Sequence, residues 1–123
     1  MSPRPKYLNL LQIQMPAPAV VSILHRISGA LLFAALPVLL WWLQQSLVSP
    51  DSYASYRSLF SGWLFKIIAL VLAWAYIHHV LAGIRHLNMD MHMGLDLHSA
   101  RATSMVVLAL SVVLTIVAGA LLW

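Results

Sequence analysis

Three long apolar runs, separated by short polar segments, set the pattern of the chain. They cover residues 27–50, 67–84 and 102–123, and none contains Asp, Glu, Lys or Arg. An α-helix needs about 20 apolar residues to cross roughly 30 Å of hydrocarbon, and lipid gives the backbone no other hydrogen-bond partners. The pattern predicts an all-α integral membrane protein with three transmembrane helices, as a single membrane-anchor domain over residues 1–123. With their flanking residues, the expected spans are 19–46, 61–87 and 101–123.

Proline and loop residues refine this pattern. Pro37 lies inside the first apolar run, where it is expected to kink a helix. The segment 49–58, SPDSYASYRS, begins with the turn-forming residues Ser-Pro-Asp and predicts a loop between the first two spans. A second polar segment, 88–100, contains one glycine and predicts the loop before the third span.

Composition supports a lipid-facing chain. It is 62% hydrophobic and 8% charged, whereas soluble domains carry about 25% charged residues. Cysteine is absent, which excludes thiolate metal sites, disulfides and iron–sulfur ligation by this chain. The formal net charge is +4, but the basic residues are scattered singly, so no nucleic-acid partner is expected.

Basic side chains are distributed unequally between the two sides that the spans create. Such residues are enriched on the cytoplasmic side of membrane proteins, so we expect a cytoplasmic N-terminus and a periplasmic C-terminus. The short segment before the first span favours a multi-pass protein of the bacterial inner membrane over one of the mitochondrial inner membrane. The N-terminal side carries Arg4, Lys6, Arg26, Arg85 and Arg101, and the other side carries Arg57 and Lys66.

Polar residues at membrane depth are the candidates for chemistry. Near the start of the first span, Ser22, Arg26 and Gly29 follow i, i+4, i+7 spacing and share one helix face, with His25 beside it. This face combines a hydroxyl, a permanent cation and a bare backbone patch that a flat ligand can approach. The alternative is that Arg26 snorkels to lipid phosphates while Ser22 bonds to its own helix.

The second span carries another polar stripe. His79, Gly83 and His86 share a face, and His78 and Arg85 form a neighbouring one. At the depth of His79, a neutral imidazole needs a partner. It either coordinates iron while its other nitrogen hydrogen-bonds, with Gly83 leaving room for a porphyrin, or it makes a hydrogen bond between helices. Arg85 and His86 are expected at the interface or as binders of an anionic group.

After its first residue, the third span carries small residues in place of histidine and arginine. Ser104, Ser111 and Ala118 recur at heptad spacing, with Thr115 and Gly119 alongside. This small-residue stripe predicts packing against another helix and carries no chemistry. Tryptophans are expected as anchors at the outer ends of the spans: Trp41, Trp42, Trp63 and Trp123.

Two motifs give the chain a family resemblance. RPKYLNL at residues 4–10, followed by SILHRISG at 22–29, is similar to the pattern RP…L…SI-x-HR-x-[ST]G. HVLAGIRHLNMD at residues 79–90 is similar to H-x-x-x-GIRHL-x-x-D. Both patterns belong to the cytochrome b subunits of bacterial succinate dehydrogenase, the larger of two hydrophobic anchors. The chain resembles this family essentially from end to end.

The resemblance implies roles for individual residues. His79 matches the axial haem ligand, Ser22 and Arg26 match residues of the quinone site, and His25 and Arg26 match residues near the haem propionates. The chain departs from the family in having a second histidine, His78, directly before His79. The spacing to the GIRH element selects His79, because His78 points about 100° around the helix.

The resemblance also implies a function and partners. The chain is expected to be the haem b-binding membrane anchor of a succinate:quinone oxidoreductase, forming part of a heteromeric helix bundle. A second small anchor subunit would supply the other axial histidine. Flavoprotein and iron–sulfur subunits would oxidise succinate, for which this chain has no motif, and pass electrons to quinone.

Three alternatives remain open on the sequence. A quinol:fumarate reductase anchor would use the same electron path in reverse. A haem-free structural anchor would keep the quinone face and lack the histidine of the second span. A small membrane transporter needs an embedded carboxylate or inverted repeats, whereas Asp51, Asp90 and Asp96 lie in the expected loops and no repeat is visible.

Overall fold

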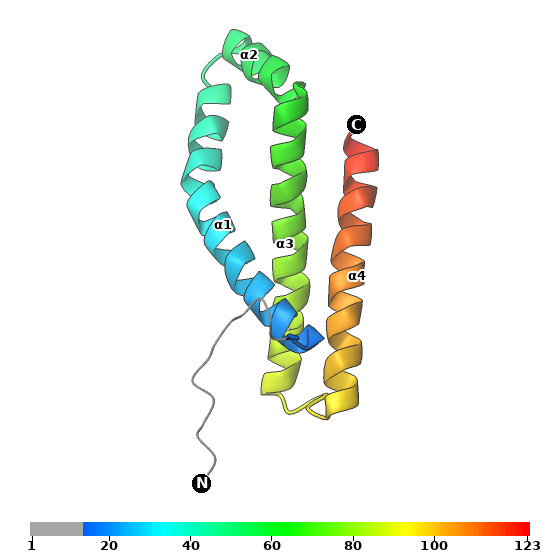
Figure 1. Cartoon of the computed structure of the whole chain (residues 1–123). Coiled ribbons are helices and arrows are strands. Elements are labelled where there is room, and N and C mark those ends of the chain that lie inside the picture. Colours follow the sequence, from blue (N-terminus) through cyan, green and yellow to red (C-terminus); the bar gives the residue numbers. More distant parts are fainter. Residues whose placement is uncertain (1–13) are drawn as a thin grey trace, which may run out of the picture.

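The computed structural model describes residues 14–123, and this part of the chain is α-helical without strands. Three helices, α1, α3 and α4, are long and apolar enough to cross a membrane. They run side by side, with α3 between the other two, while α2 lies across one end (Figure 1). The predicted all-α membrane fold is therefore confirmed, whereas the motif at 4–10 lies outside the described residues. The helices are α1 (Ala17–Ser46), α2 (Pro50–Phe60), α3 (Trp63–Asp90) and α4 (Leu97–Leu122).

The helix α2 corrects the expectation of a loop at residues 49–58. Its first residues form a helix start: the Ser49 side chain accepts a hydrogen bond from the Ser52 amide at 3.0 Å. Pro50 occupies the first turn, where its missing N–H group is harmless, and Asp51 complements the helix dipole. The Ser-Pro-Asp sequence that favours a turn also caps a helix, and here the helix follows it.

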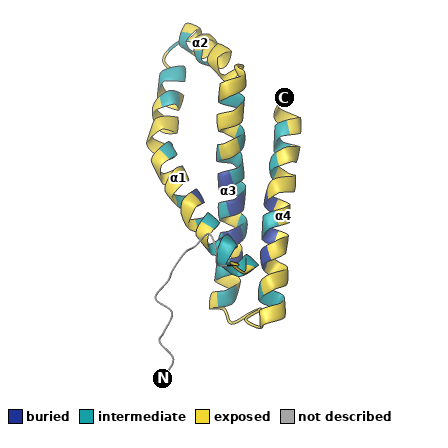
Figure 2. Ribbon diagram, in the orientation of Figure 1, coloured by how far each residue is buried: buried dark blue, intermediate teal, exposed yellow. Residues whose placement is uncertain are grey.

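The buried core lies in the half of the bundle away from α2 (Figure 2). Much of α1 beyond this half is exposed, and α1 is bowed away from α3 there (Figure 1). Pro37 lies inside this part of α1 and removes a hydrogen bond from its ladder. The described residues that are buried are mostly small or polar: Val21, Ser28, Ala75, His78, Ala82, Arg85, Ser104, Val107 and Ser111.

The small-residue stripe of α4 packs as predicted. Ser104 and Ser111 are buried and hydrogen-bond to carbonyl oxygens of their own helix. Further along, a Cβ atom added to Gly119 would lie 2.8 Å from Leu70 Cδ2 of α3. Small residues therefore let α3 and α4 approach closely, as is typical of helix pairs in membranes.

Aromatic residues cluster at the end of the bundle that α2 covers. Trp42, Phe60 and Phe65 join α1, α2 and α3 by edge contacts, with ring centroids 5.5 to 5.9 Å apart. Lys66 lies 5.8 Å from the ring of Trp123. Such amphipathic and cationic groups suit a membrane–water interface.

The start of α4 gives a pH-dependent prediction. The Asp96 carboxylate caps α4 by accepting a hydrogen bond from the Ser99 amide at 2.9 Å, and this bond lowers the pKa of Asp96 from its ordinary value of 3.8. Because the folded pKa is the lower one, the stabilisation is present above pH 3.8 and is lost as the pH falls through the folded value. Asp96→Asn retains a capping oxygen without this titration.

Thermal unfolding midpoints of the purified protein, measured from pH 7 to pH 3, test this effect. Near pH 3 the unfolding midpoint of the wild type should fall relative to that of Asp96→Asn, because only the wild type loses its capping carboxylate. Asp90→Asn, at the exposed end of α3, is the matched control and should follow the wild-type profile. A constant difference between wild type and Asp96→Asn across the range contradicts the assignment.

Candidate functional site

Three histidine rings stack where α1 crosses α3. His25 of α1 lies between His79 and His86 of α3, with ring centroids 4.2 Å from His79 and 4.9 Å from His86. The planes are close to parallel, at 15° and 28°. The stripe that the sequence predicts on the second span is therefore the surface that receives His25.

Hydrogen bonds fix the ring of His79 and its tautomer. Its Nδ1 lies 3.1 Å from the His25 carbonyl oxygen and 3.2 Å from Ser28 Oγ, while the Ser28 hydroxyl donates to the same carbonyl at 2.9 Å. A carbonyl oxygen only accepts, so Nδ1 carries the proton. In the neutral ring this leaves the lone pair on Nε2, which makes no hydrogen bond to the described residues.

The two glycines at the crossing make room for imidazole rings. A Cβ atom on Gly29 would lie 2.9 Å from His79 Cε1, and one on Gly83 would lie 3.7 Å from His25 Nε2. The expectation of an open backbone patch at Gly29 is therefore wrong, because His79 covers it. At Gly83 the neighbouring ring is likewise a histidine of the same chain.

These distances predict different outcomes for two equivalent substitutions. Gly29→Ala forces the hydrogen-bonded His79 ring to move and should destabilise the fold by about 1–3 kcal/mol. Gly83→Ala adds an ordinary van der Waals contact and removes a flexible residue from a helix, so it should be neutral or stabilising. Chemical denaturation in detergent measures both. Equal losses for the two variants contradict the close approach at Gly29.

His78 points to a different helix from its neighbour. Its Nδ1 lies 3.4 Å from Ser111 Oγ of α4, and its ring stacks on Trp74 with centroids 5.3 Å apart. The side chain is fully buried, and Nε2 has no hydrogen-bond partner among residues 14–123. His78 therefore joins α3 to α4, whereas His79 joins α3 to α1.

The other predicted site residues of α1 lie at the surface of this crossing. Ser22 is half-buried and Arg26 is exposed, one helical turn apart on the face they share with Gly29. Within the described part of the chain, neither side chain hydrogen-bonds to the histidine rings. The structure thus brings His25 and His79 together and leaves Arg26 accessible from outside the chain.

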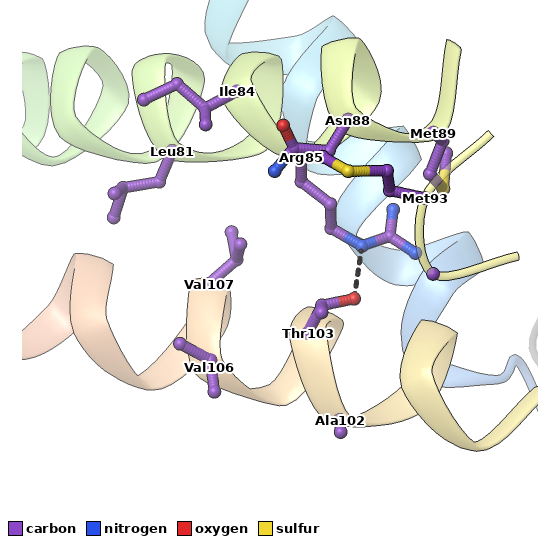
Figure 3. A pocket seen from close by; sticks show the side chains of 11 residues that line it. Leu81, Ile84, Arg85, Asn88, Met89, Met93, Ala102, Thr103, Val106 and Val107 are labelled. Carbon is purple, nitrogen blue, oxygen red and sulfur yellow. Dashed lines mark hydrogen bonds between the residues drawn. The ribbon is translucent and has the colours of Figure 1, made fainter. Parts of the chain in front are cut away.

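Arg85 and His86 lie in the last two turns of α3. Arg85 is only 6% exposed, and its Nε donates to Thr103 Oγ1 at 3.1 Å (Figure 3). Its Nη2 donates to the Ala100 carbonyl at 3.3 Å. Arg85 is thus held against α4 by two neutral oxygen acceptors, and its expected place at the membrane interface stays a prediction. His86 Nδ1 donates to the Ala82 carbonyl at 2.7 Å, a bond within its own helix.

Comparison with known proteins identifies the family to which this architecture belongs. The family described as succinate dehydrogenase/fumarate reductase transmembrane subunit matches residues 1–118. The chain belongs to this family. The resemblance carried by the two sequence motifs is thereby confirmed, and so is the membrane-anchor fold.

Relatives of the succinate dehydrogenase/fumarate reductase transmembrane subunit family match nearly the whole chain. The succinate dehydrogenase cytochrome b556 subunit of Paracoccus denitrificans is 36% identical, over 92% of this chain and 87% of its own length. The protein of the same name from Coxiella burnetii is 32% identical, over 98% and 97%. That of Rickettsia felis is 31% identical, over 98% and 90%.

Sequence reasoning missed three residues that shape the site of this family member. Ser28 bonds to His79, Trp74 stacks on His78, and Thr103 binds Arg85. Ser28 had a usable signal, since it is a polar residue one helical turn after His25 in an apolar span. The other two partners depend on how α3 and α4 face each other, which spacing within one helix does not reveal.

Proposed function

We propose that this chain is the haem b-binding anchor subunit of a succinate:quinone oxidoreductase and helps to form its quinone-reduction site. The observation that carries the proposal is the geometry of His79: its Nδ1 lies 3.1 Å from the His25 carbonyl oxygen, which leaves Nε2 as the nitrogen that can bind a metal. The names of the relatives, which are succinate dehydrogenase cytochrome b556 subunits, support the same role. These names favour succinate oxidation coupled to quinone reduction over the reverse reaction of a fumarate reductase.

The residues present fit an axial haem ligand. A ligating histidine commonly donates its other N–H group to a carbonyl, which fixes the ring and raises the basicity of the metal-binding nitrogen. His79 has this arrangement, and Ser28 stabilises it from the same helix as the carbonyl. His78 fits less well, because its ring is fully buried between α3 and α4. When bound between two histidines, haem b supplies a one-electron carrier.

The other ligand is assigned to a second small hydrophobic anchor subunit. His78 and His79 are the two histidines in the middle part of α3, and His78 faces α4. Large apolar side chains of α1 beyond the histidine crossing are exposed, Phe33 to 82%. Helices of a second anchor, together with lipid, would cover this surface and bring a histidine toward His79.

Arg26 and His25 are assigned to the haem propionates, and Arg26 also acts with Ser22 at the quinone site. The Ser22 hydroxyl donates a hydrogen bond to a quinone carbonyl oxygen. The Arg26 guanidinium stabilises the negative charge that develops on that oxygen during reduction. Protons come from water at the adjacent membrane surface, since both residues lie near the start of α1.

Succinate oxidation is assigned to soluble partners. Flavin and iron–sulfur centres require binding motifs that this chain lacks, cysteine above all. A flavoprotein and an iron–sulfur subunit would therefore dock at the end that carries Ser22 and Arg26. With the N-terminus in the cytoplasm and the C-terminus in the periplasm of a bacterial inner membrane, this end faces the cytoplasm.

A spectrum of the purified complex tests the proposal directly. The dithionite-reduced minus oxidised difference spectrum should show a low-spin haem b, and succinate should reduce added quinone. Steady-state rates in both directions separate a succinate dehydrogenase from a fumarate reductase. An assembled complex without a haem band contradicts the proposal and supports the haem-free anchor.

A further inference from the structure

A cavity of about 310 Å³ opens between α3 and α4 at the end of the bundle opposite α2 (Figure 3). Its polar members are the buried guanidinium of Arg85, the amide of Asn88 and the hydroxyl of Thr103. None of these residues belongs to the histidine crossing between α1 and α3. The apolar side chains that extend the cavity along the helices are Leu81, Ile84, Val106 and Val107.

Within residues 14–123, the hydrogen bonds of Arg85 include none to a carboxylate. Both of its hydrogen-bond acceptors, Thr103 Oγ1 and the Ala100 carbonyl, are neutral oxygens. The nearest acids along the chain are engaged elsewhere or exposed: Asp96 accepts from the Ser99 amide, and Asp90 is exposed at the end of α3. A buried arginine is stabilised when an anion completes its hydrogen bonds, so the cavity favours a negatively charged ligand.

The depth of the cavity indicates which anion it receives. Arg85 lies five residues before the end of α3 at Asp90, which is about 7.5 Å along the helix axis. With 28 residues α3 is about 42 Å long, which exceeds the roughly 30 Å hydrocarbon core, so we expect Arg85 near the boundary between lipid phosphates and acyl chains. From there, Leu81 and Val107 continue the groove deeper into the span, where its apolar lining suits a hydrocarbon chain.

We propose that the α3–α4 groove is a binding site for an anionic phospholipid of the membrane leaflet on that side. The phosphate pairs with Arg85 and accepts a hydrogen bond from Asn88. One acyl chain lies along Leu81, Ile84, Val106 and Val107. The lipid seals the junction of α3 and α4 without taking part in the reaction.

Lipid binding to the purified assembled complex tests the site. The complex is delipidated, titrated with phosphatidylglycerol in detergent micelles, and examined by native mass spectrometry and thermal unfolding. Phosphatidylglycerol should raise the unfolding temperature more than phosphatidylcholine does. Arg85→Gln should weaken phosphatidylglycerol binding about tenfold, as expected for loss of a charge-assisted hydrogen bond. Equal effects of the two lipids overturn the proposal.

Two further variants separate the charge from the groove. Arg101→Gln removes the same charge from an exposed position near the start of α4 and should leave binding within about twofold of wild type. Val106→Trp fills the groove, keeps Arg85, and should also weaken binding. If Arg85→Gln fails to assemble, normal lipid binding by Val106→Trp overturns the proposal.

Two other results would also overturn it. Inorganic phosphate that stabilises the complex as fully as phosphatidylglycerol indicates a site for a free anion. A carboxylate of a partner subunit within ion-pair distance of Arg85 in the complex indicates a protein contact. The haem spectrum should stay unchanged in Arg85→Gln, so failure of this site and failure of the proposed function are distinguishable.

Discussion

Replacing His79 by alanine should remove haem from the assembled complex and lower the reduced-minus-oxidised absorption difference at least tenfold. Loss of a residue that only orients a metal ligand already weakens metal sites about 10- to 100-fold, and His79 is the proposed ligand itself. No neighbouring ring can replace it, because His25 lies on the face of His79 and His78 points to α4. The visible spectrum and the haem content per complex measure the effect.

His78→Ala is the matched control for this experiment. It removes the adjacent imidazole, the contact with Ser111 and the stacking on Trp74, so it should lower stability by about 1–3 kcal/mol. The haem spectrum should persist, since His78 joins α3 to α4. An unaltered haem spectrum in assembled His79→Ala, or loss of haem in His78→Ala alone, contradicts the assignment of His79.

The three long helices could be predicted because lipid allows few alternatives. An apolar run of this length has to satisfy its own backbone hydrogen bonds, so composition and length determine the helix. Helix α2 lacks that constraint. Its Ser49-Pro50-Asp51 start is equally suitable for a turn and for a helix cap, and contacts of Phe60 with Trp42 and Phe65 accompany the helical outcome.

The face of each polar residue could also be predicted, but its partner could not. Helical spacing separated His78 from His79 by about 100°, and the structure places them against different helices. The same spacing identified Gly29 as a bare patch without showing that His79 covers it. Helical periodicity shows which residues share a face of one helix. It does not show which side chain of a neighbouring helix fills the space beside a glycine on that face.

Arg85 illustrates the same limit near a span end. An arginine at this depth ordinarily snorkels to the interface, and nothing in the pattern of α3 indicates otherwise. Thr103 and the Ala100 carbonyl hold it inward because α4 begins beside the end of α3. The short loop between α3 and α4 thus brings acceptors beside Arg85 and buries a side chain that the sequence would leave facing water or lipid.

Replacing Arg26 by leucine should lower succinate:quinone turnover about 100- to 1000-fold. This is the range observed when one group that stabilises developing negative charge is removed from an active site. Arg26 is exposed on the chain, and Ser22 lies one turn before it, so both side chains are accessible to a quinone from outside α1. Ser22→Ala, which removes one neutral hydrogen bond, should have the smaller effect, about tenfold.

The readout has to separate quinone reduction from assembly. Electron transfer from succinate to an artificial acceptor that bypasses the quinone should remain at the wild-type rate in Arg26→Leu, because the soluble subunits carry that reaction. Arg26→Lys should recover part of the turnover, since it restores the charge but not the planar fork of donors. Arg101→Leu, which removes an exposed charge at the same end of the bundle, should leave quinone reduction unchanged. Wild-type turnover in Arg26→Leu would assign this arginine to lipid phosphates, with its charge at the membrane surface and no part in the reaction.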